Sequence, residues 1–274
     1  MAVMDISFYA NSLMRNVMIS VILPTDKKTG LGQEEAPPKF PVLYLLHGIF
    51  GNHRSWINGS SVQPLADAYN VCIVMPSGEN RFYCDSSKTG DYFGTFISEE
   101  LPQFIGRTFP VYTDREHTFL AGLSMGGFGT AVNGLKHPET FSRLGIFSAA
   151  LIKDRILTSR NENVQDYLTK KNYETIFDLD DVKDFEGSVN DYDALAERLT
   201  ENRPQIWMAC GNEDFLYDVN AAYAEKLKKL GYDIVWQHWP GKHDWTFWQE
   251  CIEQFIPWLL NADEAGEQSA SAGI

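Results

Sequence analysis

The feature that most constrains the fold is a series of short apolar segments separated by stretches long enough to form helices. The segments are residues 42–48, 71–76, 118–122, 144–149, 206–211 and 232–239. A segment that is apolar at nearly every position is typical of a strand buried on both faces, as in a parallel sheet covered by helices. The pattern therefore predicts an α/β fold with a mostly parallel central sheet and helices on both of its faces.

Helical patterns lie between and after these segments. The predicted helices are residues 99–108 after a Ser98 cap, 127–136 before Pro138, 220–230 before Gly231, and 245–260. The N-terminal part differs, because ISFYA and VMISVILP indicate an antiparallel pair that leads into the sheet. Residues 27–41, with their Gly and Pro residues, are predicted to be a connecting loop.

Two segments depart from the alternating pattern. Residues 153–203 are polar, acidic and without a clear apolar strand, which predicts a helical insertion or cap. Residues 261–274 consist of small and acidic residues, which is typical of a disordered tail. We therefore expect a single domain over residues 1–260, with the cap inserted at 153–203.

Composition narrows the range of partners. The chain of 274 residues has a formal net charge of -14, so it lacks the basic surface that nucleic acid or an anionic membrane requires. No apolar segment approaches the roughly 18 residues that cross a bilayer, and the start of the chain does not resemble a signal peptide. The four cysteines have no metal-type spacing, which favours reduced thiols and the cytoplasm. Self-association of identical chains is left open.

The sequence Gly122-Leu123-Ser124-Met125-Gly126 matches the pattern Gly-x-Ser-x-Gly. In a nucleophile elbow, a strand turns abruptly into a helix and lifts the serine hydroxyl above the sheet. The flanking glycines are needed because any side chain there would keep strand and helix apart. With an apolar strand before it and a helix after it, the motif predicts Ser124 as a nucleophile.

A catalytic serine needs a histidine base and an acid that orients it, in the chain order Ser, Asp or Glu, His. Glu213, Asp214 and Asp218 follow one predicted strand, and His243 follows the next. Loops at the carboxyl ends of strands are where open α/β sheets place their sites. We favour Asp214 over its two acidic neighbours, and His243 as the base. His117, His137 and His238 lie at positions more typical of surface or structural roles.

An oxyanion hole combines two backbone N–H groups. We expect one from Met125, directly after the serine, and the other from Ile49 in the loop His47-Gly48-Ile49-Phe50-Gly51. His47 opens this loop and is interpreted as a structural hydrogen-bonding residue rather than a base or a metal ligand.

Aromatic side chains near these loops can line a pocket. The candidates are Trp56, Tyr92, Phe93, Phe215, Trp245 and Trp248. Because Trp56, Tyr92 and Trp245 lie in segments next to the predicted catalytic loops, we expect these three to contact the substrate. An aromatic wall suits short acyl groups and can stack on a hydroxycinnamoyl ring.

Several motifs together resemble one known family. They are PVLYLLHGIFGNHRSW, AGLSMGGFG, CGNEDFLYDVN, LKKLGYD and PGKHDWTFWQ. In these motifs the chain resembles the esterase D-like α/β-hydrolases, most closely the bacterial tributyrin esterases, which are small intracellular carboxylesterases. The resemblance implies hydrolysis of short-chain acyl esters by Ser124, Asp214 and His243, with Ile49 and Met125 as oxyanion donors. It implies no metal and no organic cofactor, and a small-molecule ester as the partner.

Relatives of that superfamily leave alternatives for the substrate. A feruloyl or acetyl xylan esterase is the main one. A thioesterase of the S-formylglutathione type is disfavoured, because glutathione carboxylates call for a cationic pocket mouth and the chain is acidic. A non-catalytic hydrolase-fold binding protein is the alternative from a different class, although its expected sign, loss of Ser, Asp or His, is absent from the sequence.

Overall fold

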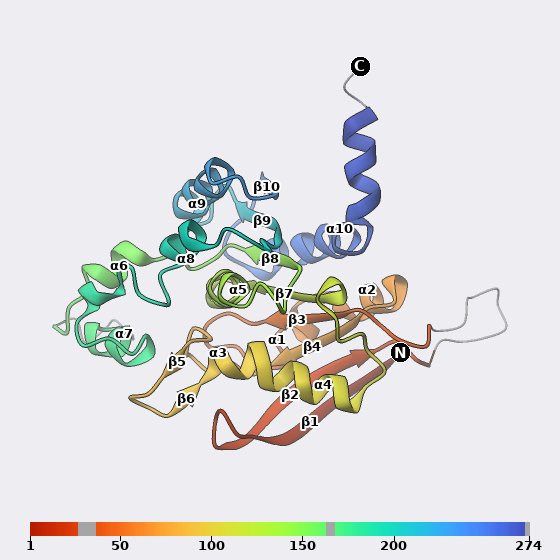
Figure 1. Cartoon of the computed structure of the whole chain (residues 1–274), viewed down its shortest axis with the longest axis horizontal. Helices are drawn as coiled ribbons and strands as arrows, with labels where there is room; N and C mark the ends of the chain where they lie inside the picture. The colour runs from red at the N-terminus through yellow and green to blue at the C-terminus, as the bar shows by residue number, and fades with distance from the viewer. Residues whose placement is uncertain (27–36, 163–167, 272–274) are drawn as a thin grey trace.

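The central element of the computed structural model is an eight-stranded sheet with the order β1-β2-β4-β3-β7-β8-β9-β10 (Figure 1). The structure describes residues 1–26, 37–162 and 168–271. The strands are β1 (Ala2–Ala10), β2 (Arg15–Leu23), β3 (Val42–Leu46), β4 (Cys72–Pro76), β7 (Thr118–Leu123), β8 (Arg143–Phe147), β9 (Gln205–Gly211) and β10 (Ile234–Trp239). β4, β3 and β7 to β10 are parallel, whereas β1 and β2 are antiparallel. This confirms the predicted fold class.

The helices cover both faces of the sheet and divide the core into two clusters. α1 (Ser55–Gly59), α2 (Val62–Tyr69) and α10 (Trp245–Ser271) pack on one face. On the other face lie α4 (Leu101–Thr108), α5 (Met125–Lys136) and α9 (Tyr217–Lys229). Because alternate residues of a strand point to opposite faces, β3 contributes Leu43 and Leu45 to the first cluster and Tyr44 and Leu46 to the second. Burial on both faces explains why these strands are continuously apolar.

The helix before β7 begins earlier than the sequence predicts. It starts with α3 (Phe93–Thr95), continues through a π-helical turn at Phe96–Glu100, and leads into α4. Ser98 is buried inside this helix and does not cap it. The prediction of a Ser98 cap was wrong because buried apolar residues extend the helix face into the turns before Ser98. A two-stranded hairpin, β5 (Asp85–Ser86) and β6 (Asp91–Tyr92), precedes the helix.

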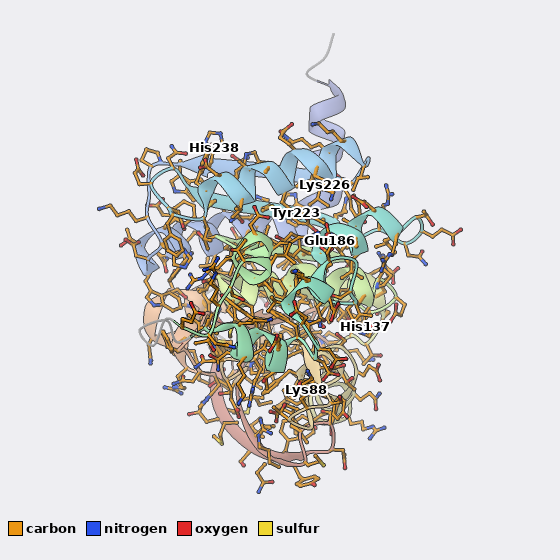
Figure 2. The ribbon with its side chains drawn as sticks, turned by 90° about the vertical axis from the view of Figure 1, so that its left-hand side faces the viewer. Lys88, His137, Glu186, Tyr223, Lys226 and His238 are labelled. Carbon is orange, nitrogen blue, oxygen red and sulfur yellow. The ribbon has the colours of Figure 1, made fainter. Side chains whose placement is uncertain are left out.

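The insertion between β8 and β9 is helical in its described parts. It contains α6 (Lys153–Leu157), α7 (Lys170–Ile176), a 3-10 turn at Val182–Phe185 and α8 (Tyr192–Arg198). Lys226 and Tyr223 of α9, on the face shown in Figure 2, attach the insertion to the domain. Lys226 forms ion pairs with Asp193 and Glu197, and Tyr223 packs edge-on against Tyr192.

At the C-terminal end of the chain, α10 continues to Ser271 and so includes most of the segment for which a disordered tail is predicted. Residues 261–271 are rich in Ala, Glu and Gln, which are strong helix formers. Most of the loop predicted at 27–41 lies outside the described residues.

Candidate active site

Ser124 lies at the junction of β7 and α5, at the carboxyl edge of the sheet (Figure 1). Its backbone has φ 54° and ψ -117°, a region that residues other than glycine rarely adopt. The Ser124 N–H donates to the carbonyl of Phe147 in β8, at 2.9 Å, and this bond holds the turn against the sheet. The strained serine between a strand and a helix has the geometry of a nucleophile elbow.

The glycines of the motif provide clearance at this turn. A Cβ atom on Gly122 would lie 2.6 Å from the carbonyl group of Gly126. A Cβ atom on Gly126 would lie 2.6 Å from the carbonyl oxygen of Leu46, at the end of β3. Both distances are too short for any side chain, so the motif brings β3, β7 and α5 together at one point.

The structure brings Ser124, His243 and Asp214 together, as the sequence analysis predicts. The Nε2 atom of His243 lies 2.9 Å from the Ser124 hydroxyl oxygen. The Nδ1 atom lies 2.8 Å from Oδ2 of Asp214. Asp214 follows β9 and His243 follows β10, so each side chain comes from the carboxyl end of a parallel strand. With the Asp214 carboxylate accepting from Nδ1–H, Nε2 is free to accept the serine proton.

Asp214 is held as a carboxylate although its side chain is 0 % exposed. Burial alone raises the pKa of Asp214, but hydrogen bonds from His243, the Leu216 N–H and Ser148 lower it by more, so that the pKa lies below its ordinary value of 3.8. The Leu216 N–H donates to Oδ1 at 2.8 Å. The acid is thus ionised and aimed at the histidine.

The other acidic and histidine candidates lie outside the hydrogen-bonded path of Ser124, His243 and Asp214. Glu213 accepts a hydrogen bond from the Gly241 N–H, which connects the loops after β9 and β10. Asp218 lies in the first turn of α9. His117 pairs with Asp114 and His238 contacts Asn212.

His47 anchors the loop after β3. Its Nδ1–H donates to the Gly48 carbonyl at 2.6 Å, and its Nε2 accepts from the Gly78 N–H at 2.8 Å. Burial lowers the pKa of His47 to about 4, so the ring is neutral near pH 7. These contacts agree with a structural role and leave the ring without a free nitrogen for catalysis.

Two backbone N–H groups remain available, one of Met125 directly after Ser124 and one of Ile49, which follows Gly48 in the loop beside Ser124. Within the described residues, neither the Ile49 N–H nor the Met125 N–H donates to a protein acceptor. The adjacent Phe50 N–H, in contrast, donates to the side chain of Asn80 at 2.9 Å. The available donors are those that the sequence analysis assigns to an oxyanion hole.

The aromatic residues that contact His243 are two of the six candidates, Phe215 and Trp248, and not the three that we favoured. Trp56 is 1 % exposed, donates its indole N–H to the Leu46 carbonyl and packs edge-on against Trp245. The expectation that Trp56 contacts substrate was wrong, because its ring belongs to the core between the sheet and α10. Tyr92 is partly exposed, but the contacts described for it are with Ser12 and Asp85.

His243 instead contacts two other aromatic rings. The ring centroid of Phe215 is 4.6 Å from that of His243, and the side chain of Trp248 packs edge-on against the imidazole at 5.0 Å. Trp245 is one step removed, since it contacts Trp248. Phe215 is 76 % exposed although it is large and apolar. Its position directly after Asp214 is the sequence signal that favours Phe215 over Trp56.

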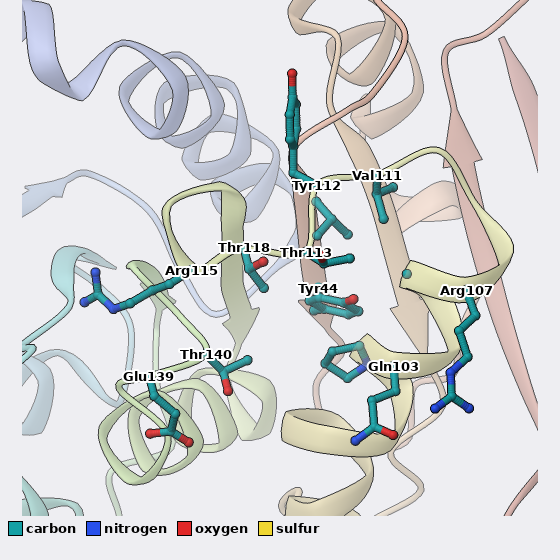
Figure 3. A pocket seen from close by; sticks show the side chains of 13 residues that line it. Tyr44, Gln103, Arg107, Val111, Tyr112, Thr113, Arg115, Thr118, Glu139 and Thr140 are labelled. Atoms are coloured by element: carbon teal, nitrogen blue, oxygen red, sulfur yellow. The ribbon is translucent and has the colours of Figure 1, made fainter.

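One cavity of about 400 Å³ lies away from these residues (Figure 3). It is bordered by α4 and by Tyr44 and Thr118, near the amino ends of β3 and β7. Ser124 lies beyond the carboxyl end of β7, so this cavity is not part of the candidate active site.

Among the described residues, no three His, Cys, Asp or Glu side chains are grouped as metal ligands. In the same part of the chain, no helix has both the length and the apolar character of a membrane span.

The sheet, the elbow and the linked Ser, His and Asp side chains define the chain as an α/β-hydrolase. Residues 10–259 match the model of the Esterase family. The chain is also 38% identical, over 268 residues, to an acetyl esterase from Caldicellulosiruptor saccharolyticus, with 96% of this chain and 100% of the relative covered. The chain therefore belongs to the esterase family and is a carboxylesterase, in agreement with its resemblance to the esterase D-like enzymes.

Solved structures share the fold. The substrate-bound fluorophosphonate-binding serine hydrolase FphF of Staphylococcus aureus superposes with a TM-score of 0.81 at 22% identity, covering 95% of this chain and 98% of that one. A ferulic acid esterase superposes with a TM-score of 0.74 at 24% identity, covering 95% and 98%. At these identities the likeness concerns the fold alone.

Proposed function

We propose that the protein hydrolyses short-chain acyl esters through an acyl-enzyme intermediate on Ser124. The observation that carries this proposal is the continuous hydrogen-bonded path from Ser124 through His243 to Asp214, with distances of 2.9 and 2.8 Å. A neutral histidine in this position accepts the serine proton while the carboxylate stabilises the resulting imidazolium.

The reaction proceeds in two halves. The Ser124 oxygen attacks the ester carbonyl carbon as His243 takes its proton, and the N–H groups of Ile49 and Met125 donate to the oxyanion. The carbon–oxygen bond to the alcohol then breaks, and the alcohol leaves with the proton from His243. In the second half, water attacks the acyl carbon and gives a proton to His243. The bond from the acyl carbon to the Ser124 oxygen then breaks, His243 returns the proton to that oxygen, and the acid leaves.

Replacement of Ser124 by alanine tests the assignment. We expect Ser124→Ala to lower kcat on p-nitrophenyl acetate and butyrate by more than about 10⁴-fold with little change in thermal stability, because the nucleophile is lost. The parent enzyme should bind a fluorophosphonate covalently and the variant should not. Ser142→Ala is the matched control, because Ser142 directly precedes β8, whereas Ser124 follows the carboxyl end of β7. Unchanged turnover in Ser124→Ala, or no labelling of the folded parent, would contradict the proposal and favour a binding protein.

A second cavity supports acetylated carbohydrates as an alternative substrate class. It has a volume of about 490 Å³ and begins at Phe50, the residue after Ile49. The exposed Phe50 ring and the amides of Asn80 and Asn172 line it, and α7 of the insertion forms its far side. Aromatic rings with planar amides suit a hydroxyl-rich alcohol. The 38%-identical relative is an acetyl esterase, which agrees with this choice.

Relative rates distinguish the candidates. A simple carboxylesterase of the tributyrin type hydrolyses p-nitrophenyl butyrate fastest, whereas a carbohydrate or feruloyl esterase favours acetylated xylo-oligosaccharides or methyl ferulate.

The four cysteines are buried and unpaired with one another, which supports a reducing compartment such as the cytoplasm.

A further inference from the structure

Tyr83 is a fully buried tyrosine in the loop after β4, and its backbone has an unusual conformation. It is 0 % exposed and has φ 57°, in a region that residues other than glycine rarely adopt. Residues strained in this way cluster at active sites and other functional positions. Burial raises the pKa of the Tyr83 hydroxyl well above its ordinary value of 10.0, so this group remains a neutral hydrogen-bond donor.

Tyr83 is held against α5, the helix that begins at Met125. A Cβ atom on Gly129 of α5 would lie 2.6 Å from Cδ2 of Tyr83, so the tyrosine ring packs directly against the helix backbone. The Tyr83 carbonyl accepts a hydrogen bond from the side-chain amide of Asn133, one turn further along α5, at 2.9 Å. Near the hydroxyl end of the ring, a Cβ atom on Gly78 would overlap the tyrosine. The two glycines therefore leave the space that the ring occupies.

The hydroxyl of Tyr83 reaches the loop that carries Ile49. It donates to the His47 carbonyl at 3.0 Å, and the two rings pack edge-on with their centroids 5.8 Å apart. The next residue, Gly48, lies beside the nucleophile, because a Cβ atom on it would be 3.4 Å from Cβ of Ser124. The Gly48 carbonyl accepts from Nδ1–H of His47 at 2.6 Å. The N–H of the same trans peptide, which is that of Ile49, therefore points to the opposite side.

Tyr83 thus connects the two elements that carry the expected oxyanion donors. The Met125 N–H belongs to the first residue of α5, and the Ile49 N–H belongs to the loop that the Tyr83 hydroxyl holds. Such donors accelerate the reaction only when they lie where the oxyanion forms. A small displacement of either donor therefore weakens the stabilisation of the transition state more than it weakens the binding of the ester.

We propose that Tyr83 is a positioning residue of the oxyanion hole, which holds the loop of Ile49 at a fixed distance from the start of α5. The inference rests on the proposed function, in which the N–H groups of Ile49 and Met125 stabilise the oxyanion. Tyr83 is fully buried, so it does not touch the substrate, and it acts through the His47 carbonyl.

Tyr83→Phe tests the role of the hydroxyl, because it removes this group and keeps the ring that packs against α5. We expect kcat on p-nitrophenyl butyrate to fall by about 5- to 10-fold, as for the loss of one neutral hydrogen bond. Complete loss of an oxyanion donor would cost more, about 10²- to 10³-fold. KM should stay within about twofold of the parent, because the oxyanion is absent from the bound ester.

An alkyl trifluoromethyl ketone tests the same point without turnover. The Ser124 oxygen adds to the ketone carbon, the serine proton passes to His243, and the former carbonyl oxygen becomes an oxyanion that accepts from the two N–H groups. We expect the inhibition constant to rise in Tyr83→Phe by the same factor by which kcat/KM falls. A smaller fraction of folded enzyme would lower kcat without changing the inhibition constant.

Tyr232→Phe is the matched control. The Tyr232 hydroxyl is also buried and donates to a backbone carbonyl, that of Ala196, at 2.9 Å. It lies near the amino end of β10, whereas the candidate active site is at the carboxyl ends of the strands. This variant should keep the parental kcat and inhibition constant at a temperature well below the melting transition.

Three results would overturn the role of Tyr83. They are a kcat of Tyr83→Phe within about twofold of the parent, an unchanged inhibition constant in that variant, and an equal fall of kcat in Tyr232→Phe. If Ser124→Ala remains active, the proposed function itself fails, whatever the behaviour of Tyr83.

Discussion

His47 is a titratable residue beside the active site that the folded protein keeps neutral. Its two ring nitrogens bond to the backbone of Gly48 and Gly78, so protonation would remove the acceptor that Gly78 needs. The ordinary pKa of a histidine is 6.5, and burial lowers that of His47 to about 4. The loop that carries Ile49 is therefore stable only while His47 is uncharged.

This predicts a loss of stability in acid. Between pH 6.5 and about 4, the unfolded chain binds a proton at His47 and the folded chain does not, so lowering the pH favours unfolding. Across this range His47 removes about 3 kcal/mol from the free energy of unfolding. Urea denaturation at several pH values should show a weaker pH dependence in His47→Gln than in the parent. Equal slopes in the two proteins would contradict the assignment.

At the residue scale, the sequence predicts the candidate catalytic residues more accurately than the aromatic residues that line the pocket. Ser124, Asp214 and His243 could be found because each lies in a loop just after a recognisable strand, in a fixed chain order. The direction of Trp56 could not be predicted, since a ring on a short helix can face either the core or the solvent.

At the scale of elements, the elbow depends on the contact between α5 and the end of β3. Gly126 is the point of contact, since a Cβ atom there would lie 2.6 Å from the Leu46 oxygen and 2.8 Å from the His47 oxygen. These are backbone atoms, which cannot relieve the overlap by a change of rotamer as a flexible side chain can. Any side chain at Gly126 must push α5 away from the loop that carries Ile49.

We therefore expect Gly126→Ala to destabilise the protein by about 1–3 kcal/mol, the usual cost of overpacking, and to lower kcat. Chemical denaturation and turnover of p-nitrophenyl butyrate measure both effects. Gly106→Ala in α4 is the matched control, because its Cβ atom would meet only the side chain of Thr113. The explanation is wrong if both alanine variants are equally stable and active.

At the scale of the whole molecule, α10 completes the core on one face of the sheet. Ile252, Phe255, Ile256 and Leu259 are fully buried there, and all four precede residue 260. The alternation of strands and helices predicted this arrangement from the sequence. The order of the strands in the sheet could not be predicted in the same way, because it depends on which crossover passes over which face.

The predicted domain limit of residue 260 can be tested by truncation. A chain ending at Leu260 should lose less than about 1 kcal/mol of unfolding free energy and keep its esterase rates, because it retains the buried residues. A chain ending at Gln249 should not fold. Each of the four lost side chains contributes about 1.5–3 kcal/mol, and together they are comparable to the stability of a typical domain. An unfolded 1–260 chain would show that the domain extends further.

The attachment of the insertion to α9 also bears on how such an enzyme can diversify. Lys226 and Tyr223 hold Asp193 and Tyr192, at the start of α8, while α9 itself follows the loop of Asp214. The part of the insertion before Asp191 has a second attachment, because Phe177 packs against Phe82 and against Phe128 of α5. A segment exchanged there must therefore keep an aromatic residue at position 177 as well as the anchor at 191–193.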